Sequence, residues 1–178
     1  MQKRRDIKRI NDNLMITYQK LEKCPEDEIV KALFVAAGIG QIIASRASIA
    51  GAQGGCQAEI GSASAMTAGA LVFLRGGSLQ QIYEATALAL KGLLGLVCDP
   101  VAGLVEVPCV KRNVIGAVNA VSAADMALAG IESRVPVDQV IDCMGDVGRR
   151  LPVELRETAL GGVAASPTGC ALSKRIFG

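Results

Sequence analysis

The sequence predicts an all-α fold, a single compact domain of about six helices that are rich in small residues. The first observation is composition: 51% of the residues are apolar but only 3% are aromatic, so Ala, Leu, Ile and Val must form most of the core. The second is the 20 glycines, which let helices pack at close range, whereas a β-sandwich needs aromatic and β-branched pairs. The third is length, because 178 residues suit one domain.

Proline, glycine and capping residues mark the expected helices in order. Pro25 and the acidic residues after it start a buried helix. The GAQGG stretch at 51–55 ends it, and Gly76–Gly77 end the next. Ser78 and Gln81 form a capping box for a third. The stretch 96–108, with two prolines, predicts a structured loop. The expected helices are 29–44, 56–75, 79–93, 109–129, 137–150 and a short one at 152–160.

Charge and hydropathy give no indication of a nucleic-acid-binding or a membrane-spanning protein. Residues 1–20 form a basic N-terminal segment that we expect to be poorly ordered, ahead of a helical domain over 21–178. A net charge of +2 gives no reason to expect nucleic acid as a partner. The uncharged runs are shorter than the roughly 20 residues that cross a bilayer, so we expect no membrane span and a cytoplasmic protein. Its thiols should then be reduced.

Three of the six cysteines lie at boundaries between elements. Cys56 follows two glycines and opens a helix, Cys109 follows Pro108 and opens another, and Cys98 lies between them before Asp99 and Pro100. A helix N-terminus should lower the pKa of a thiol and favour the thiolate that binds metal. The chain has no histidine, which excludes Ser–His–Asp and Cys–His nucleophile systems. Thiolate-only ligation indicates structural zinc or an iron–sulfur cluster, and the wide spacing without any CxxC favours the cluster.

The segments around these cysteines resemble a known family. GGCQAEIGSASAM (Gly54–Met66), GLVCDPVAGLVEVPCVKRN (Gly95–Asn113) and LRETALGGVAASPTG (Leu155–Gly169) are similar to the iron–sulfur-dependent L-serine dehydratases whose α and β chains are separate. The intervals also agree with that family, with 42 residues from Cys56 to Cys98 and 11 from Cys98 to Cys109. The similarity extends from about Leu21 to Gly178.

The resemblance implies a lyase of amino-acid degradation and gluconeogenesis. It implies a [4Fe–4S] cluster held by Cys56, Cys98 and Cys109, with an iron that lacks a protein thiolate acting as Lewis acid in the elimination of water from L-serine, giving pyruvate and ammonia. The expected partners are L-serine, a β chain, and an N-terminal α segment that carries the substrate-binding loop, in an oligomeric assembly. That α segment is expected to be missing here, so we expect the chain to be inactive alone. The general base is not identified.

Polar residues next to the ligands are second-rank candidates. Gln57, Glu59, Arg112 and Asn113 follow the cysteines on first helical turns, where they either tune the iron and bind carboxylate or serve as caps and solvated surface. Cys170, in a Pro-Thr-Gly turn, is the weakest candidate for an additional ligand, since some relatives have a C-terminal cysteine that reaches the open iron. Cys24 is expected at an exposed helix start and Cys143 on the apolar face of its helix.

Two alternative functions stay open from the sequence. A cluster-dependent L-cysteine desulfidase needs the same open iron, and a non-catalytic fragment or structural metal-binding protein needs only the thiolates. Pyridoxal phosphate chemistry, the other route to serine dehydration, requires a different fold and a lysine Schiff base.

Overall fold

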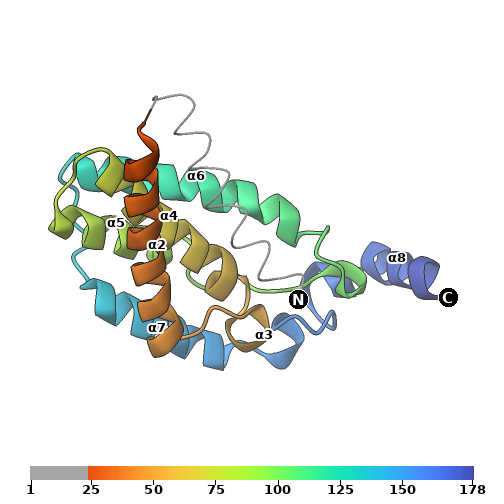
Figure 1. Ribbon diagram of the computed structural model, residues 1–178. Coiled ribbons are helices and arrows are strands. Elements are labelled where there is room, and N and C mark those ends of the chain that lie inside the picture. The colour runs from red at the N-terminus through yellow and green to blue at the C-terminus, as the bar shows by residue number, and fades with distance from the viewer. Residues whose placement is uncertain (1–23) are drawn as a thin grey trace.

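A computed structural model describes residues 24–178 and confirms the all-α fold (Figure 1). Within this range there are seven α-helices and no strand. The helices are α2 (Glu26–Arg46), α3 (Gly51–Gly54), α4 (Ser62–Leu74), α5 (Leu79–Gly92), α6 (Cys109–Leu128), α7 (Val137–Arg150) and α8 (Pro167–Phe177). Short helical turns lie between them: a π-helical turn η1 (Gln57–Gly61), and 3₁₀ turns η2 (Val101–Gly103), η3 (Val153–Leu155) and η4 (Gly162–Ala165). The expectation for residues 1–20 falls outside the described residues.

Helix α4 is the centre of the domain, with α2, α5 and α6 packed around it. Its sequence SASAMTAGALVFL is made mostly of small residues, and its first turns are buried almost without interruption. Small side chains let neighbouring backbones approach closely on every side. Asn119 of α6 adds polar links, because its Nδ2 donates to Ser64 Oγ at 2.8 Å and to the Ala89 carbonyl of α5 at 2.9 Å.

Helix α2 covers one side of α4 and is less buried than the sequence suggested. Its inner face carries Ile29, Ala32, Ala36 and Ile43, whereas Phe34 is 74% exposed. The prediction of a buried helix was therefore wrong for its outer face, because among the described elements α2 packs mainly against α4 and, to a lesser extent, α7. Among the described helices, α2 alone is long and apolar enough to span a membrane by length and composition.

The segment after α7 differs most from expectation. Residues 152–160 form only the turn η3 and a bend, because Glu157 and Ala159 have positive φ and the backbone at Arg156 pairs in parallel with Cys98. The short helix predicted there was wrong. A helix that the sequence analysis missed, α8, begins instead at Pro167, with Ser166 Oγ accepting from the Gly169 N–H at 3.1 Å.

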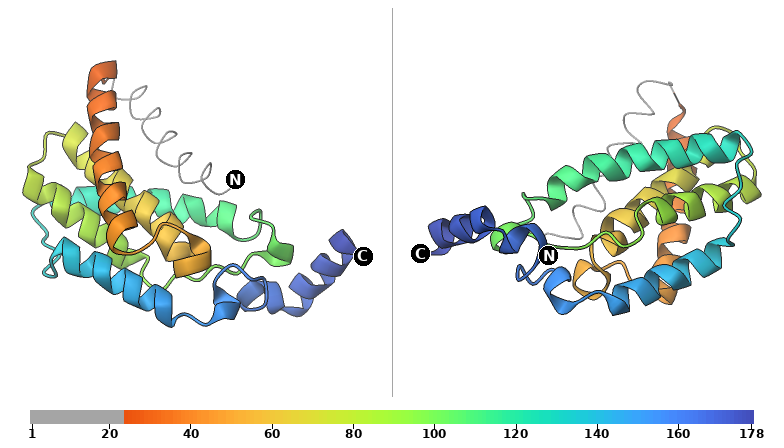
Figure 2. Two further views of the ribbon diagram at one scale, coloured as in Figure 1. Left: turned by 60° about the horizontal axis from the view of Figure 1, so that its bottom comes forward. Right: turned by 180° about the vertical axis from the view of Figure 1, so that it is seen from behind.

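Parts distant in the sequence meet at one end of the domain. The turn η2 packs against η4 and α8, and α8 extends away from the helical bundle in both views of Figure 2. The three conspicuous cysteines lie at this end.

Candidate metal centre

Cys56, Cys98 and Cys109 form a single buried cluster, called here the cysteine cradle. Their Sγ atoms all lie within 4.8 Å of one another. Cys56 and Cys98 are fully buried and Cys109 nearly so. The three residues come from three elements, the start of η1, the loop before η2 and the first turn of α6. The structure thus brings together the three cysteines that the sequence singled out.

Close backbone contact places Cys56. Gly55 has a φ of +76°, which disfavours any residue with a side chain, and a Cβ there would lie 2.9 Å from the Leu96 carbonyl oxygen. The Gln57 N–H donates to that same carbonyl at 2.9 Å. The turn that carries Cys56 is therefore fixed directly against the loop that carries Cys98.

The third segment that resembles the family, Leu155–Gly169, supports Cys98. The Cys98 N–H donates to the Leu155 carbonyl at 2.8 Å, and the Cys98 carbonyl accepts from the Glu157 N–H at 2.7 Å. Cys109 is the first residue of α6, where its neighbour Val110 donates its N–H to the Val105 carbonyl at 2.9 Å. Backbone bonds thus hold the main chain at or beside each cysteine.

The predicted lowering of the thiol pKa at a helix start was wrong for Cys56. The pKa of Cys56 is raised, first by side-chain hydrogen bonds with Cys109 and Cys98 and then by burial. The pKa of Cys98 is raised to about 12, with the hydrogen bond to Cys109 as the largest cause. Ionising several adjoining thiols in a buried site is unfavourable because the thiolates repel one another and lose their hydration. Hydrogen bonding between the thiols, burial and this repulsion together outweigh the effect of the helix dipole. A bound cation reverses this balance, because a coordinating thiol loses its proton.

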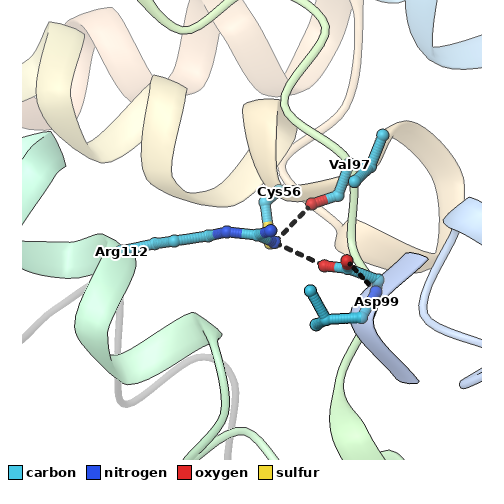
Figure 3. Close-up of polar contacts among 5 residues, drawn as sticks. Cys56, Val97, Asp99 and Arg112 are labelled. Carbon is cyan, nitrogen blue, oxygen red and sulfur yellow. Dashed lines mark hydrogen bonds and ion pairs between the residues drawn. The ribbon is translucent and has the colours of Figure 1, made fainter. Parts of the chain in front are cut away.

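One cation approaches the cradle. Arg112 Nη1 donates to Asp99 Oδ1 at 2.7 Å and to the Val97 carbonyl at 2.8 Å, and lies 3.8 Å from Cys56 Sγ (Figure 3). Burial lowers the pKa of Arg112, but the hydrogen bond and charge of Asp99 raise it by more, with a further contribution from Cys56. Arg112 therefore stays positive beside the sulfur.

Comparison with known proteins assigns the family. The family model described as serine dehydratase alpha chain matches residues 13–164. The chain belongs to the serine dehydratase alpha chain family. It is 62% identical over 152 residues to a probable L-serine dehydratase alpha chain of Latilactobacillus sakei, and 60% identical over 152 residues to one of Bacillus subtilis. It is 56% identical over 132 residues to the L-serine dehydratase alpha chain of Peptoniphilus asaccharolyticus.

These matches cover different shares of the relatives. They take in 85% of this chain for the first two and 74% for the third. The chain spans 73% of the Latilactobacillus protein, but about half of the Bacillus protein (51%) and 45% of the Peptoniphilus protein. The matched residues of this serine dehydratase alpha chain family member include the whole cysteine cradle.

Among the polar candidates of this family member, only Arg112 is shown against a cradle sulfur. Gln57 is 1% exposed and spans two elements: its Nε2 donates to the Met144 carbonyl at 3.1 Å and its Oε1 accepts from the Gly95 N–H at 2.8 Å. Glu59 Oε1 accepts from the Gly51 N–H at 3.0 Å, at the start of α3. Asn113 is half-buried on α6. For Gln57 the geometry favours structural hydrogen bonding, whereas the charge of Glu59 also contributes to the raised pKa of Cys98.

The other cysteines lie apart from the cradle. Cys170 is exposed on α8, with its Sγ 3.8 Å from the Ala164 carbonyl, and it does not join the three clustered thiols. Cys143 is exposed, which corrects the prediction that it lies in the core; the buried face of α7 is Val140, Ile141, Met144 and Gly148. Cys24 is partly buried against the core.

Sequence reasoning missed Asp99 as a functional residue. It is 2% exposed, and its second oxygen, Oδ2, accepts from the Val163 N–H at 2.9 Å. A signal was available: an acidic residue between a cysteine and a proline, in a stretch that is otherwise apolar, requires a buried partner. Arg112, 13 residues further on, is that partner.

Proposed function

We propose that this chain is the cluster-bearing part of an iron–sulfur L-serine dehydratase, a cytoplasmic lyase. The observation that carries the proposal is the convergence of three buried thiols from three separate segments, in a chain of the serine dehydratase alpha chain family. In this reaction the Cα–H and Cβ–OH bonds of L-serine break and a C=C bond forms. The products are water and aminoacrylate, whose hydrolysis gives pyruvate and ammonia.

The donors of the cradle suit an iron–sulfur cluster. All three are sulfur, the ligand type that selects zinc or iron–sulfur clusters, and they are buried, so bulk water has little access to them. Cys56, Cys98 and Cys109 would hold a [4Fe–4S] cluster, which supplies Lewis-acid chemistry at the iron that lacks a protein thiolate. Arg112 places a positive charge against Cys56 and so favours the thiolate form.

The remaining parts of the enzyme are proposed to come from elsewhere. Relatives are named alpha chains, and this chain spans as little as 45% of one of them. We therefore propose that the substrate-binding loop lies in the part of those relatives that this chain does not span, and that a β chain completes the enzyme. Exposed apolar side chains on α6, which begins at the cradle, offer that assembly a surface: Val114, Ile115 and Val118 are 63%, 58% and 60% exposed.

Two other functions remain as alternatives to this proposal. The spacing of the thiols, within 4.8 Å, also suits a single ion, so a structural zinc site is the non-catalytic alternative. An L-cysteine desulfidase would use the same open iron, and the substrate-binding loop rather than the cradle would distinguish cysteine from serine.

Anaerobic reconstitution tests the cofactor. Iron and sulfide supplied to the purified chain should give about four irons per chain with matching sulfide, as expected for a cubane cluster bound by cysteines. Alanine at any one of Cys56, Cys98 or Cys109 should abolish uptake. Cys143→Ala is the matched control, since that thiol is exposed and outside the cradle. Stoichiometric zinc without sulfide would overturn the cluster assignment.

A second assay tests the reaction. The reconstituted chain is supplemented with the N-terminal segment of a related α chain and with a β chain of the same family. It should then release pyruvate from L-serine faster than sulfide from L-cysteine. The reverse preference would favour the desulfidase.

A further inference from the structure

The Asp99 carboxylate joins the cysteine cradle to the C-terminal segment, residues 162–178. Its Oδ1 accepts from Arg112 and its Oδ2 accepts from the Val163 N–H, at 2.7 and 2.9 Å. The side chain is 3% exposed. A buried carboxylate with each oxygen bonded to a different element cannot rotate to improve one bond without weakening the other.

The first arm of this link reaches the cradle. Arg112 bonds the carbonyl of Val97, the residue before Cys98, and the same nitrogen faces the sulfur of Cys56 (Figure 3). Its position therefore depends on two cysteine-bearing segments at once.

The second arm reaches the C-terminal segment. Val163 lies in η4, which leads into α8, and both pack against the turn η2 that follows Asp99. The approach is close, since a Cβ at Gly162 would overlap Asp99 Oδ2, and Gly162 has a φ of +60°. This position therefore favours glycine on both steric and conformational grounds.

We propose that Asp99 is a positioning residue that couples iron binding in the cysteine cradle to the docking of the C-terminal segment. The inference rests on the proposed function, since it requires iron to bind the cradle. Iron bound by all three cysteines ties the segments that carry Cys56 and Cys98 together, and Arg112, which contacts both segments, is thereby held in place. Arg112 then holds Oδ1, and the fixed carboxylate presents Oδ2 to Val163. Because coupling between sites is reciprocal, a docked C-terminal segment also stabilises the bound iron.

Hydrogen exchange on the reconstituted and unreconstituted chain tests the coupling. Iron uptake should slow amide exchange in residues 162–178 by about tenfold, a typical size for coupling between two sites. Asp99→Asn should remove this slowing, because asparagine has one carbonyl oxygen and turns an NH₂ group toward one of the two donors. It should also release iron to a chelator about tenfold faster, the lower range for loss of a residue behind a metal ligand.

Two further variants separate the arms from a general loss of fold. Arg112→Gln cuts only the first arm, so it should release iron faster and lose the iron-dependent slowing. Its exchange with iron is compared with its own exchange without iron, because loss of the buried partner of Asp99 speeds exchange in both states. Asp125→Asn is the control, because Asp125 pairs with Arg75 on an exposed surface. It should behave like the unaltered chain in every measurement.

The outcomes distinguish the two proposals. If the unaltered chain takes up no iron, both the proposed function and the coupling are overturned. If it takes up iron and the Asp99 and Arg112 variants match it in chelator release and in exchange of residues 162–178, the coupling alone is overturned.

Discussion

Replacing glycine by alanine should have opposite effects on the free energy of unfolding at two helical positions, Gly148 and Gly38. Gly148 of α7 faces the turn before Cys56, and a Cβ there would lie 2.8 Å from Gly54 Cα, 0.6 Å short of the 3.4 Å at which ordinary contact begins. Gly38 of α2 has no atom within 4 Å of the same position. Alanine in a helix interior is favoured over glycine by about 1 kcal/mol, and that gain applies to both. Overpacking costs about 1–3 kcal/mol and applies only at Gly148.

The neighbour of Gly148 is a backbone atom, so the contact cannot be relieved by a side-chain rotation. Gly148→Ala should therefore lower the free energy of unfolding by about 1 kcal/mol, while Gly38→Ala raises it by up to about 1 kcal/mol. Urea unfolding of the two variants, followed by circular dichroism, should give midpoints on opposite sides of the unaltered chain with equal slopes. A Gly148→Ala midpoint at or above that of Gly38→Ala would refute the steric argument.

Three further predictions concern other contacts. Asn119→Ala removes two hydrogen bonds that join α6 to α4 and α5, and should lower the free energy of unfolding by about 1–3 kcal/mol in the same urea assay. Arg46 holds the pKa of Asp142 low through a hydrogen bond. This pair therefore stabilises the fold above the ordinary aspartate pKa, and the stabilisation is lost as pH falls. Asp142→Asn should remove this pH dependence from a plot of the free energy of unfolding against pH. Val118→Lys should leave iron uptake unchanged but reduce binding to a β chain in a pull-down assay, and unchanged binding would exclude this face of α6.

The helix boundaries that could be predicted are those set by local chemistry. Ser78 accepts from the Gln81 N–H while Gln81 accepts from the Ser78 N–H, so this capping box forms as the sequence indicates. The start of α8 carries an equally local signal, because Ser166 caps the helix and Pro167 opens it. The failure at 152–160 has a different cause, because that backbone is drawn into pairing with Cys98, over 50 residues earlier in the chain. No local pattern reports such a contact.

In the cysteine cradle, too, some features follow from local sequence and others only from contacts between distant segments. The positions of Cys56 and Cys109 at helix starts follow from the glycines and the proline before them, and are found in the structure. The pKa of Cys56 could not be predicted from those positions, because its largest cause is a hydrogen bond to another thiol brought close by the tertiary fold. The contacts of Asp99 with Arg112 and Val163 could not be predicted either, because they form only when the fold brings these three segments together.

Gln57 offers a sharper test of whether residues beside the ligands act on structure or on iron. Its amide donates to Met144 and accepts from Gly95, so both ends are used within the protein. Gln57→Glu keeps the shape and the acceptor but turns a carboxylate oxygen toward the Met144 carbonyl. At neutral pH this buries a charge and leaves that carbonyl without its donor, so the free energy of unfolding should fall by about 2–4 kcal/mol.

Protonation of the introduced carboxyl restores a donor toward Met144, which fixes the sign of the pH dependence. Burial and the facing carbonyl raise the folded-state pKa of that carboxyl above its unfolded value of about 4.3. The deficit in the free energy of unfolding should therefore be smallest below that value and grow as pH rises toward the folded-state pKa. Gln57→Leu, which has no ionisable group, should show a deficit that does not change with pH. Parallel deficits for the two variants across this pH range would mean that Gln57 does not form the buried bond to Met144, and a role at the metal would then regain support.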